Sequence, residues 1–133
     1  MDVVVEKTIK FGLGSDIGGG TTPSLFNAMA DAYKIQQVRG LVLSPFQLWY
    51  LATLGGANAL SLRSETGSLE AGKSADFVVL DLEATPLMSL RASRANSVED
   101  FLAGLIFIGD DRMVLETTIA GRGVHSRPVT ADL

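Results

Sequence analysis

One aspartate stands where a catalytic side chain could lie. Asp16 follows Gly14 at the end of a predicted strand, and the glycines Gly18–Gly20 come almost directly after it. Glycine lets the backbone approach a ligand closely, and catalytic side chains of α/β barrels lie at the carboxyl ends of the strands. The residue pattern by itself, however, favours an aspartate that stabilises a turn or caps a helix.

A second segment, Gly67–Ser74, matches the phosphate-binding pattern G-x-x-x-x-G-K-[ST]. Such a loop binds phosphate where it leaves a buried strand and opens a helix. Here the loop follows polar residues and leads into a predicted strand, and Glu70 would place a carboxylate where the phosphate belongs. We interpret Gly67 and Gly72 as turn residues and Lys73 as a solvated side chain, with ATP binding as an alternative hypothesis.

Few other residues suggest chemistry. The chain has one histidine, His125, and no cysteine, so it lacks the His and Cys sets that zinc prefers. We interpret His125 as a surface residue. Asp110 and Asp111 could form an acid–base pair, but neighbouring residues of an extended chain point to opposite faces, and Arg112 can pair with one of them. This segment is therefore interpreted as a structural turn.

Several larger side chains could contact a small ligand. Met29, Trp49 and Tyr50 lie in predicted helices, where such residues usually belong to the core. Thr21 and Thr22 lie close to Asp16, but a capping role at the start of the next helix explains them without a ligand.

The composition excludes several classes of function. The chain has 133 residues, of which 47% are hydrophobic and 20% charged. The formal net charge is -4 and the basic residues are scattered, which argues against nucleic-acid binding. No window approaches the roughly 18 apolar residues of a membrane span, and the N-terminus lacks a signal-peptide pattern. We expect a cytoplasmic protein that binds neither nucleic acid nor membrane.

The elements that must position these residues follow from periodicity and capping signals. The alternating and β-branched runs predict three strands, and Ser or Thr followed by Pro or an acidic residue predicts three helix starts. The predicted strands are Thr8–Gly14, a mostly buried Ala75–Leu82, and Met113–Ala120 followed by a turn at Gly121–Gly123, and the predicted helices begin near Pro23, Ser44 and Ser97. A boundary near residues 62–67 separates a helical half from a strand-rich half.

Three segments carry a family resemblance. Gly12–Thr21 resembles the eighth-strand motif of guanine deaminases in the amidohydrolase superfamily. Thr53–Leu60 together with Gly67–Asp81 is similar to the superfamily more broadly, which explains the phosphate-loop lookalike. Phe107–Gly121 resembles the final part of guanine deaminases. The segments follow the family order over nearly the whole chain.

The resemblance implies a chemistry. Members of this family bind one zinc ion through a His-x-His pair, two further histidines and the eighth-strand aspartate. Asp16 would then be both the metal ligand and the catalytic proton shuttle for hydrolysis of guanine to xanthine and ammonia. No substrate-binding residue is assigned. Because the chain has a single histidine, we expect it to be inactive alone and to hold no zinc by itself.

The resemblance also implies a fold, α/β with an added β part. Residues 1–62 would supply the last strand and helices of a (β/α)8 barrel, and residues 63–133 the C-terminal part of its accessory β-sandwich. Strands that lack neighbours leave unpaired edges, so we expect the chain studied alone to rearrange or to self-associate, with a homo-oligomer as the expected assembly. Two alternatives remain, a non-catalytic self-associating fold fragment and another amidohydrolase that acts on a purine or triazine ring.

Overall fold

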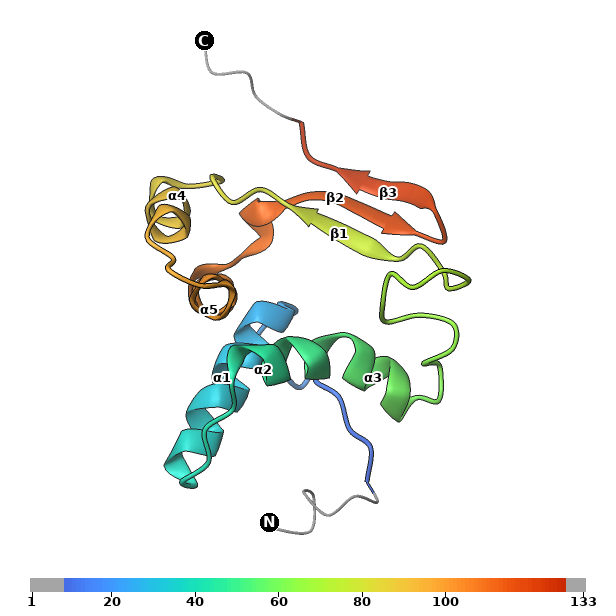
Figure 1. The fold of residues 1–133 in the computed structure, drawn as a ribbon, viewed down its shortest axis with the longest axis horizontal. Coiled ribbons are helices and arrows are strands. Elements are labelled where there is room, and N and C mark those ends of the chain that lie inside the picture. Colours follow the sequence, from blue (N-terminus) through green and yellow to red (C-terminus); the bar gives the residue numbers. More distant parts are fainter. Residues whose placement is uncertain (1–8, 129–133) are drawn as a thin grey trace.

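The computed structural model describes residues 9–128 of the chain. Figure 1 shows a group of helices beside a small sheet, with a long loop between α3 and β1 along one side. The elements in order are α1 (Leu25–Val38), α2 (Pro45–Ala52), α3 (Leu54–Ala59), β1 (Phe77–Leu80), α4 (Pro86–Ser93), α5 (Val98–Ile108), a 3-10 helix (Asp111–Met113), β2 (Val114–Ile119) and β3 (Arg122–Ser126). The described chain is a mixed α/β structure.

Side-chain caps define two of the predicted helix starts. In α2 the Ser44 Oγ accepts from the Gln47 backbone N–H at 3.3 Å, and the Gln47 side chain accepts from the Ser44 N–H at 2.8 Å. In α5 the Ser97 Oγ accepts from the Asp100 N–H at 3.1 Å. These contacts satisfy backbone donors that the first helical turn leaves free. The predicted starts at Ser44 and Ser97 are confirmed.

Two helix starts differ from the prediction. The residue before α1 is Ser24, so capping of this helix by Thr21 or Thr22 was wrong; the Thr22 Oγ1 instead accepts from the Ser24 N–H at 3.1 Å. Helix α4 was not predicted at all. Its signal was nevertheless local, because the Thr85 Oγ1 accepts from the backbone N–H three residues later and a proline follows Thr85 directly.

Helix α5 belongs to both hydrophobic clusters of the described chain. The first cluster joins α1, α2 and α5 and consists of Met29, Ala30, Leu48 and Ile106. The second joins α4, α5 and the 3-10 helix and consists of Met88, Leu105 and Met113. Packing of an amphipathic helix stabilises it far more than its intrinsic propensity does. Because Leu105 and Ile106 are adjacent, α5 links the two clusters directly.

The sheet is antiparallel and has the order β1-β2-β3. Phe77 lies opposite Thr118 in the β1–β2 pair, and Thr117 lies opposite His125 in the β2–β3 pair. The hairpin turn between β2 and β3 has positive φ at Ala120 (49°) and Gly121 (74°). The turn therefore precedes the predicted Gly121–Gly123 position by one residue, and β3 already begins at Arg122.

The strand predicted over Thr8–Gly14 was wrong for its described residues. Thr8 lies outside the described part, and residues 9–14 have no strand assignment. A strand requires a neighbour that shares its hydrogen bonds. Here the backbone instead follows the helices: the Leu13 N–H donates to the Leu51 carbonyl at 2.9 Å, and a Cβ at Gly12 would lie 2.4 Å from the Gly56 Cα. This segment therefore packs closely along α2 and α3.

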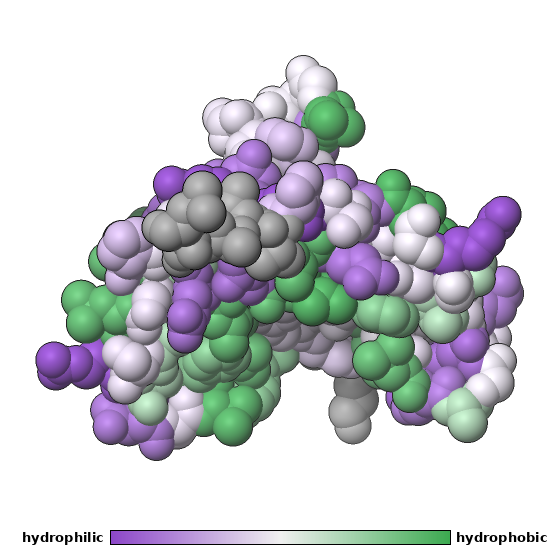
Figure 2. Space-filling view, turned by 90° about the horizontal axis from the view of Figure 1, so that it is seen from above, coloured by the Kyte–Doolittle hydropathy of each residue, from purple (hydrophilic) through white to green (hydrophobic). Residues whose placement is uncertain are grey.

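Many large apolar side chains of the described residues are exposed to solvent. Strand β1 was predicted to be mostly buried, but Phe77, Val78 and Val79 are all exposed, because no helix packs extensively against the strands in the described chain. Figure 2 shows several separate apolar patches on the face of the molecule that it views. Among the described residues, no helix is long and apolar enough to cross a membrane.

We predict that Ile106→Ala lowers the free energy of unfolding by about 2–5 kcal/mol, because this side chain is 1% exposed at the centre of the first cluster. Urea denaturation followed by circular dichroism measures the change. Val98→Ala in the same helix is the control, since Val98 is 66% exposed and its truncation should change stability by no more than about 0.5 kcal/mol. Equal effects of the two substitutions would contradict this packing.

We also predict that the isolated chain self-associates through its sheet. The outer edges of β1 and β3 lack a strand neighbour among the described residues, and Val78 is 51% exposed. Light scattering over a dilution series should show a mass above that of the monomer, and Val78→Lys should lower it. Leu69→Lys adds the same charge at a loop residue and should have no effect. A monomeric wild-type chain would refute the prediction.

Candidate functional site

Asp16 lies in a tight turn between the extended segment and α1. Its φ is 50°, in the left-handed region, and its carbonyl accepts from the backbone N–H groups of Gly19 at 2.9 Å and Gly20 at 2.5 Å. An isolated bridge joins Ile17 and Gly20 across the turn. Aspartate tolerates the left-handed region better than most residues do. The Asp16 side chain is exposed to solvent.

The glycines after Asp16 are required by space as well as by backbone angle. Gly18 has a φ of 102°, which side chains rarely adopt. A Cβ at Gly20 would lie 2.1 Å from the Ser15 carbonyl oxygen, and one at Gly19 would lie 2.8 Å from the Asp16 Oδ2. The Asp16 carboxylate therefore lies directly against Gly19, and any larger residue there would displace it.

A hollow open to solvent lies beside this turn. Its volume is about 290 Å³, near the lower end of the range for ligand pockets. It is lined by the residues flanking Asp16 and by one face of α1, namely Leu13, Gly14, Ser15, Gly20, Thr21, Thr22, Ala28, Asp31, Ala32 and Ile35. Leucine, isoleucine and alanine side chains supply its apolar surface, and the hydroxyls of Ser15, Thr21 and Thr22 and the Asp31 carboxylate supply polar groups.

The donors needed for zinc do not come together in residues 9–128. A catalytic zinc ion ordinarily has three protein ligands from His, Cys, Asp or Glu. No group of three such side chains with suitable placement exists in this part of the chain. His125 lies on β3 opposite Thr117, and not at the Asp16 turn. Asp16 alone does not hold a zinc ion, so the described residues do not fit this metal by themselves.

Asp110, the first residue of the acidic pair after α5, caps the segment that follows it. The Asp110 carboxylate accepts from the Arg112 backbone N–H at 2.9 Å and from the Arg112 guanidinium at 2.6 Å. The Arg112 side-chain hydrogen bonds hold the pKa of Asp110 below its usual value. Asp110 thereby caps the 3-10 helix that follows it. The interpretation of this segment as a structural turn agrees with these contacts.

The phosphate-loop lookalike has neither the surroundings nor the free lysine of a nucleotide site. The loop leads into strand β1, and not into a helix. The side chain of Lys73 is only 9% exposed, and its Nζ lies 2.9 Å from the Glu70 Oε2 and 2.7 Å from the Ser68 Oγ. The expectation of a solvated Lys73 was therefore wrong. Lys73 is thus paired within the loop, and its hydrogen bond to Glu70 is the chief cause of the lowered pKa of that carboxyl.

The large side chains considered as ligand contacts belong mostly to the core. Met29 is fully buried, and Trp49 packs beside it while its Nε1–H donates to the Leu102 carbonyl at 3.3 Å. Phe26 meets the Trp49 ring edge-on, with centroids 6.0 Å apart. Tyr50 differs from the prediction, because it is exposed.

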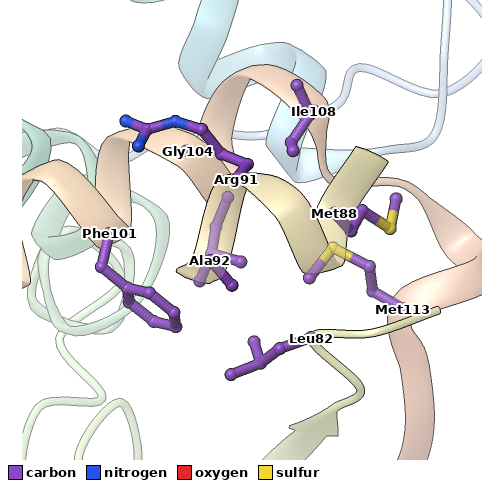
Figure 3. Close-up of a pocket in the computed structure, with 9 residues that line it drawn as sticks. Leu82, Met88, Arg91, Ala92, Phe101, Gly104, Ile108 and Met113 are labelled. Carbon is purple, nitrogen blue, oxygen red and sulfur yellow. The ribbon is translucent and has the colours of Figure 1, made fainter. Parts of the chain in front are cut away.

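A small apolar cavity between α4 and α5 carries no site. Figure 3 shows Met88 and Met113 facing the same space, whereas the guanidinium of Arg91 points away from them. The cavity measures about 10 Å³, roughly enough for one water molecule. Arg91 instead pairs with Asp100, a contact that the sequence did not reveal. The second cluster therefore closes here without room for a ligand.

Curated relatives resemble this chain along most of its length. It is 43% identical over 122 residues to a guanine deaminase of Escherichia coli, which covers 92% of this chain and 28% of the relative. It is 38% identical to a probable guanine deaminase of Deinococcus radiodurans and 30% identical to the guanine deaminase of Homo sapiens, with 90% and 91% of this chain covered. The chain thus spans between a quarter and a third of the length of these relatives.

Solved structures show the same local fold. The Escherichia coli guanine deaminase superposes with a TM-score of 0.92 at 42% identity, over 96% of this chain and 29% of that one. A guanine deaminase from Bradyrhizobium japonicum reaches 0.80 at 28% identity, over 90% of this chain and 32% of that one. An adenosine deaminase from Xanthomonas campestris with bound zinc reaches 0.66 at 28% identity, over 83% and 24% of the two chains.

The family assignment rests on the whole pattern. The glycine turn around Asp16, the loop before β1 and the segment after α5 all lie within the matched region. Residues 2–124 match the model of the amidohydrolase family, which is nearly the entire chain. This chain belongs to the amidohydrolase family.

Proposed function

We propose that this chain is a portion of a guanine deaminase and that it contributes one catalytic carboxylate, that of Asp16. The observation that carries the proposal is the 43% identity to the Escherichia coli guanine deaminase, together with a TM-score of 0.92 over 96% of this chain. Other curated relatives named as guanine deaminases match more than nine-tenths of the chain as well.

The chemistry required is the replacement of an amino group by water. Guanine and water give xanthine and ammonia, so a proton must leave the attacking water and another must reach the departing nitrogen. A carboxylate in a cleft can accept and return such a proton. Asp16 is exposed, and its neighbours Gly14 and Ser15 line a hollow of about 290 Å³, although Asp16 itself is not among the lining residues. This location supports a role as proton shuttle.

The described residues are not a complete active site. Zinc is proposed only for the complete enzyme, since residues 9–128 offer no cluster of three ligands. Substrate-contacting residues are likewise unassigned. We therefore propose that this chain alone does not deaminate guanine and that activity requires the portion of the relatives that it does not cover.

Adenosine is the alternative to guanine as the proposed substrate. The similarity to an adenosine deaminase, at a TM-score of 0.66, favours keeping adenosine as an alternative. The higher scores and identity belong to guanine deaminases, which favours guanine. Ammonia release from guanine and from adenosine, measured with the same protein preparation, distinguishes the two proposed substrates.

The decisive preparation is a hybrid in which this chain replaces the matched segment of the Escherichia coli guanine deaminase. We predict that the hybrid deaminates guanine and that Asp16→Asn lowers its turnover by roughly 10²- to 10⁴-fold, the usual contribution of a positioned acid or base. The amide keeps the size of the side chain but cannot carry the proton. Ammonia release under saturating guanine measures the effect.

Asp111→Asn is the matched control for this hybrid, because Asp111 is also exposed but lies in the 3-10 helix and not at the Asp16 turn. Its turnover should equal that of the unsubstituted hybrid. Normal turnover of the Asp16→Asn hybrid would remove Asp16 from the mechanism. A well-folded hybrid without activity on guanine would favour the alternative of a non-catalytic, self-associating fragment.

A further prediction concerns Gly19. Because an added Cβ would lie 2.8 Å from the Asp16 Oδ2, Gly19→Ala should displace the carboxylate without disturbing the core. Displacements of about 1 Å can cost roughly 100-fold in rate, so turnover of the hybrid should fall by up to this factor. Thermal denaturation should be nearly unchanged. Full activity in this variant would show that the carboxylate position beside Gly19 is unimportant.

A further inference from the structure

Asp76 connects segments that are far apart in the sequence. It lies directly before β1, and its Oδ1 accepts from the Ser74 Oγ at 2.8 Å and from the Ala120 backbone N–H at 2.7 Å. Its Oδ2 accepts from the Thr66 Oγ1 at 2.8 Å. One carboxylate thus joins both ends of the loop formed by residues 66–74 to the turn between β2 and β3.

The turn between β2 and β3, to which the Asp76 carboxylate binds, has an unfavourable backbone conformation. Ala120 has a φ of 49°, a left-handed angle that residues with a Cβ adopt with difficulty. Two hydrogen bonds hold it there: the one from its N–H to Asp76, and a neighbouring one from the Gly121 N–H to the Ala75 carbonyl at 3.1 Å. The Asp76 contact therefore compensates strain at the hairpin turn as well as fixing the loop.

The loop itself is closed from within by other contacts. The Ser74 N–H donates to the Glu65 carbonyl at 2.8 Å, and Lys73 binds Glu70 and Ser68. The residues that match a phosphate-binding pattern thus bind one another. The side chain of Asp76 supplies the hydrogen bonds that attach this closed loop to the sheet.

We propose that Asp76 is an acid-releasable clasp, which fixes loop 66–74 to the β2–β3 turn while it is ionised and frees both when it is protonated. This inference does not depend on the proposed deaminase activity. It rests on the three hydrogen bonds to a single carboxylate and on the left-handed turn residue that one of them holds.

The direction of the pH effect follows from the contacts. The Ala120 backbone hydrogen bond lowers the pKa of Asp76 most, followed by the hydrogen bonds from Ser74 and Thr66. A carboxyl whose pKa is lower in the folded chain stabilises that fold above its usual value of 3.8. This contribution is lost as the pH falls through the lowered pKa. The clasp is therefore closed at neutral pH and opens only in acid.

Other charged groups on the joined segments do not pair with this carboxylate. They are Glu65, Glu70 and Lys73 before β1, Glu116 on β2, and Arg122 and His125 on β3. Among the described residues, Asp76 forms no ion pair, and Lys73 pairs with Glu70. Since the glutamates also protonate in acid, a test requires a signal from the clasp itself, and the Ala120 amide provides it.

The experiment follows the Ala120 amide proton of the full 133-residue chain by NMR from about pH 7 to about pH 2.5, a range that spans carboxyl titration. We expect a downfield shift at neutral pH that disappears in one step in acid. Hydrogen exchange of the Ala120 amide, corrected for the intrinsic rate, should lose protection roughly tenfold over the same step, since a charge-assisted hydrogen bond is lost.

Variants separate the clasp from general acid unfolding. Asp76→Ala should remove the downfield shift at neutral pH, and Asp76→Asn should remove the pH step. Thr66→Val deletes one donor, so its step should move to higher pH; this variant retains the carboxylate if Asp76→Ala fails to fold. Glu83→Gln, at an exposed carboxylate just after β1, should behave as wild type. An unchanged step in Asp76→Asn or Thr66→Val, or no step in the wild-type chain, would overturn the proposal.

Discussion

Burial of α5 is the interaction on which the rest of the described structure depends. Ile106 packs against α1 and α2, while Leu105 packs against α4 and the 3-10 helix. The 3-10 helix continues directly into β2, the central strand of the sheet. Because interiors are closely packed, the position of α5 determines where both the helical group and the sheet begin. Residues on both sides of the boundary predicted near residues 62–67 therefore belong to the same hydrophobic cluster.

The Asp16 turn is held in place by α1 and α2, the two helices that pack against Ile106 of α5. Its entry is held by the backbone hydrogen bond from Leu13 to Leu51 at the end of α2, and its exit runs into α1. Between these supports, the glycines allow a backbone path that places the carboxylate against Gly19. The turn is thus well positioned, but Asp16 is the single zinc ligand that we propose in this chain, whereas a catalytic zinc ion ordinarily has three protein ligands.

Predictions from the sequence succeeded where a signal is local and satisfied within one turn. Ser44 and Ser97 cap helices as expected, because each hydroxyl meets an N–H only three residues away. The same signal at Thr85 would have revealed α4. Predictions failed where a partner decides the outcome: Lys73 is buried by its contacts, and residues 9–14 lack a strand neighbour, so alternation of side chains alone produced no strand.

The sequence by itself determined the glycine turn around Asp16, the absence of a histidine ligand set, and the family resemblance, because each depends on residue types at short spacing. Only the tertiary structure decided which surfaces stay exposed and which distant groups meet. The bond from the Ala120 N–H to Asp76 spans 44 residues. Contacts at such separation depend on how the chain closes its loops and packs its core, and no local pattern encodes that geometry.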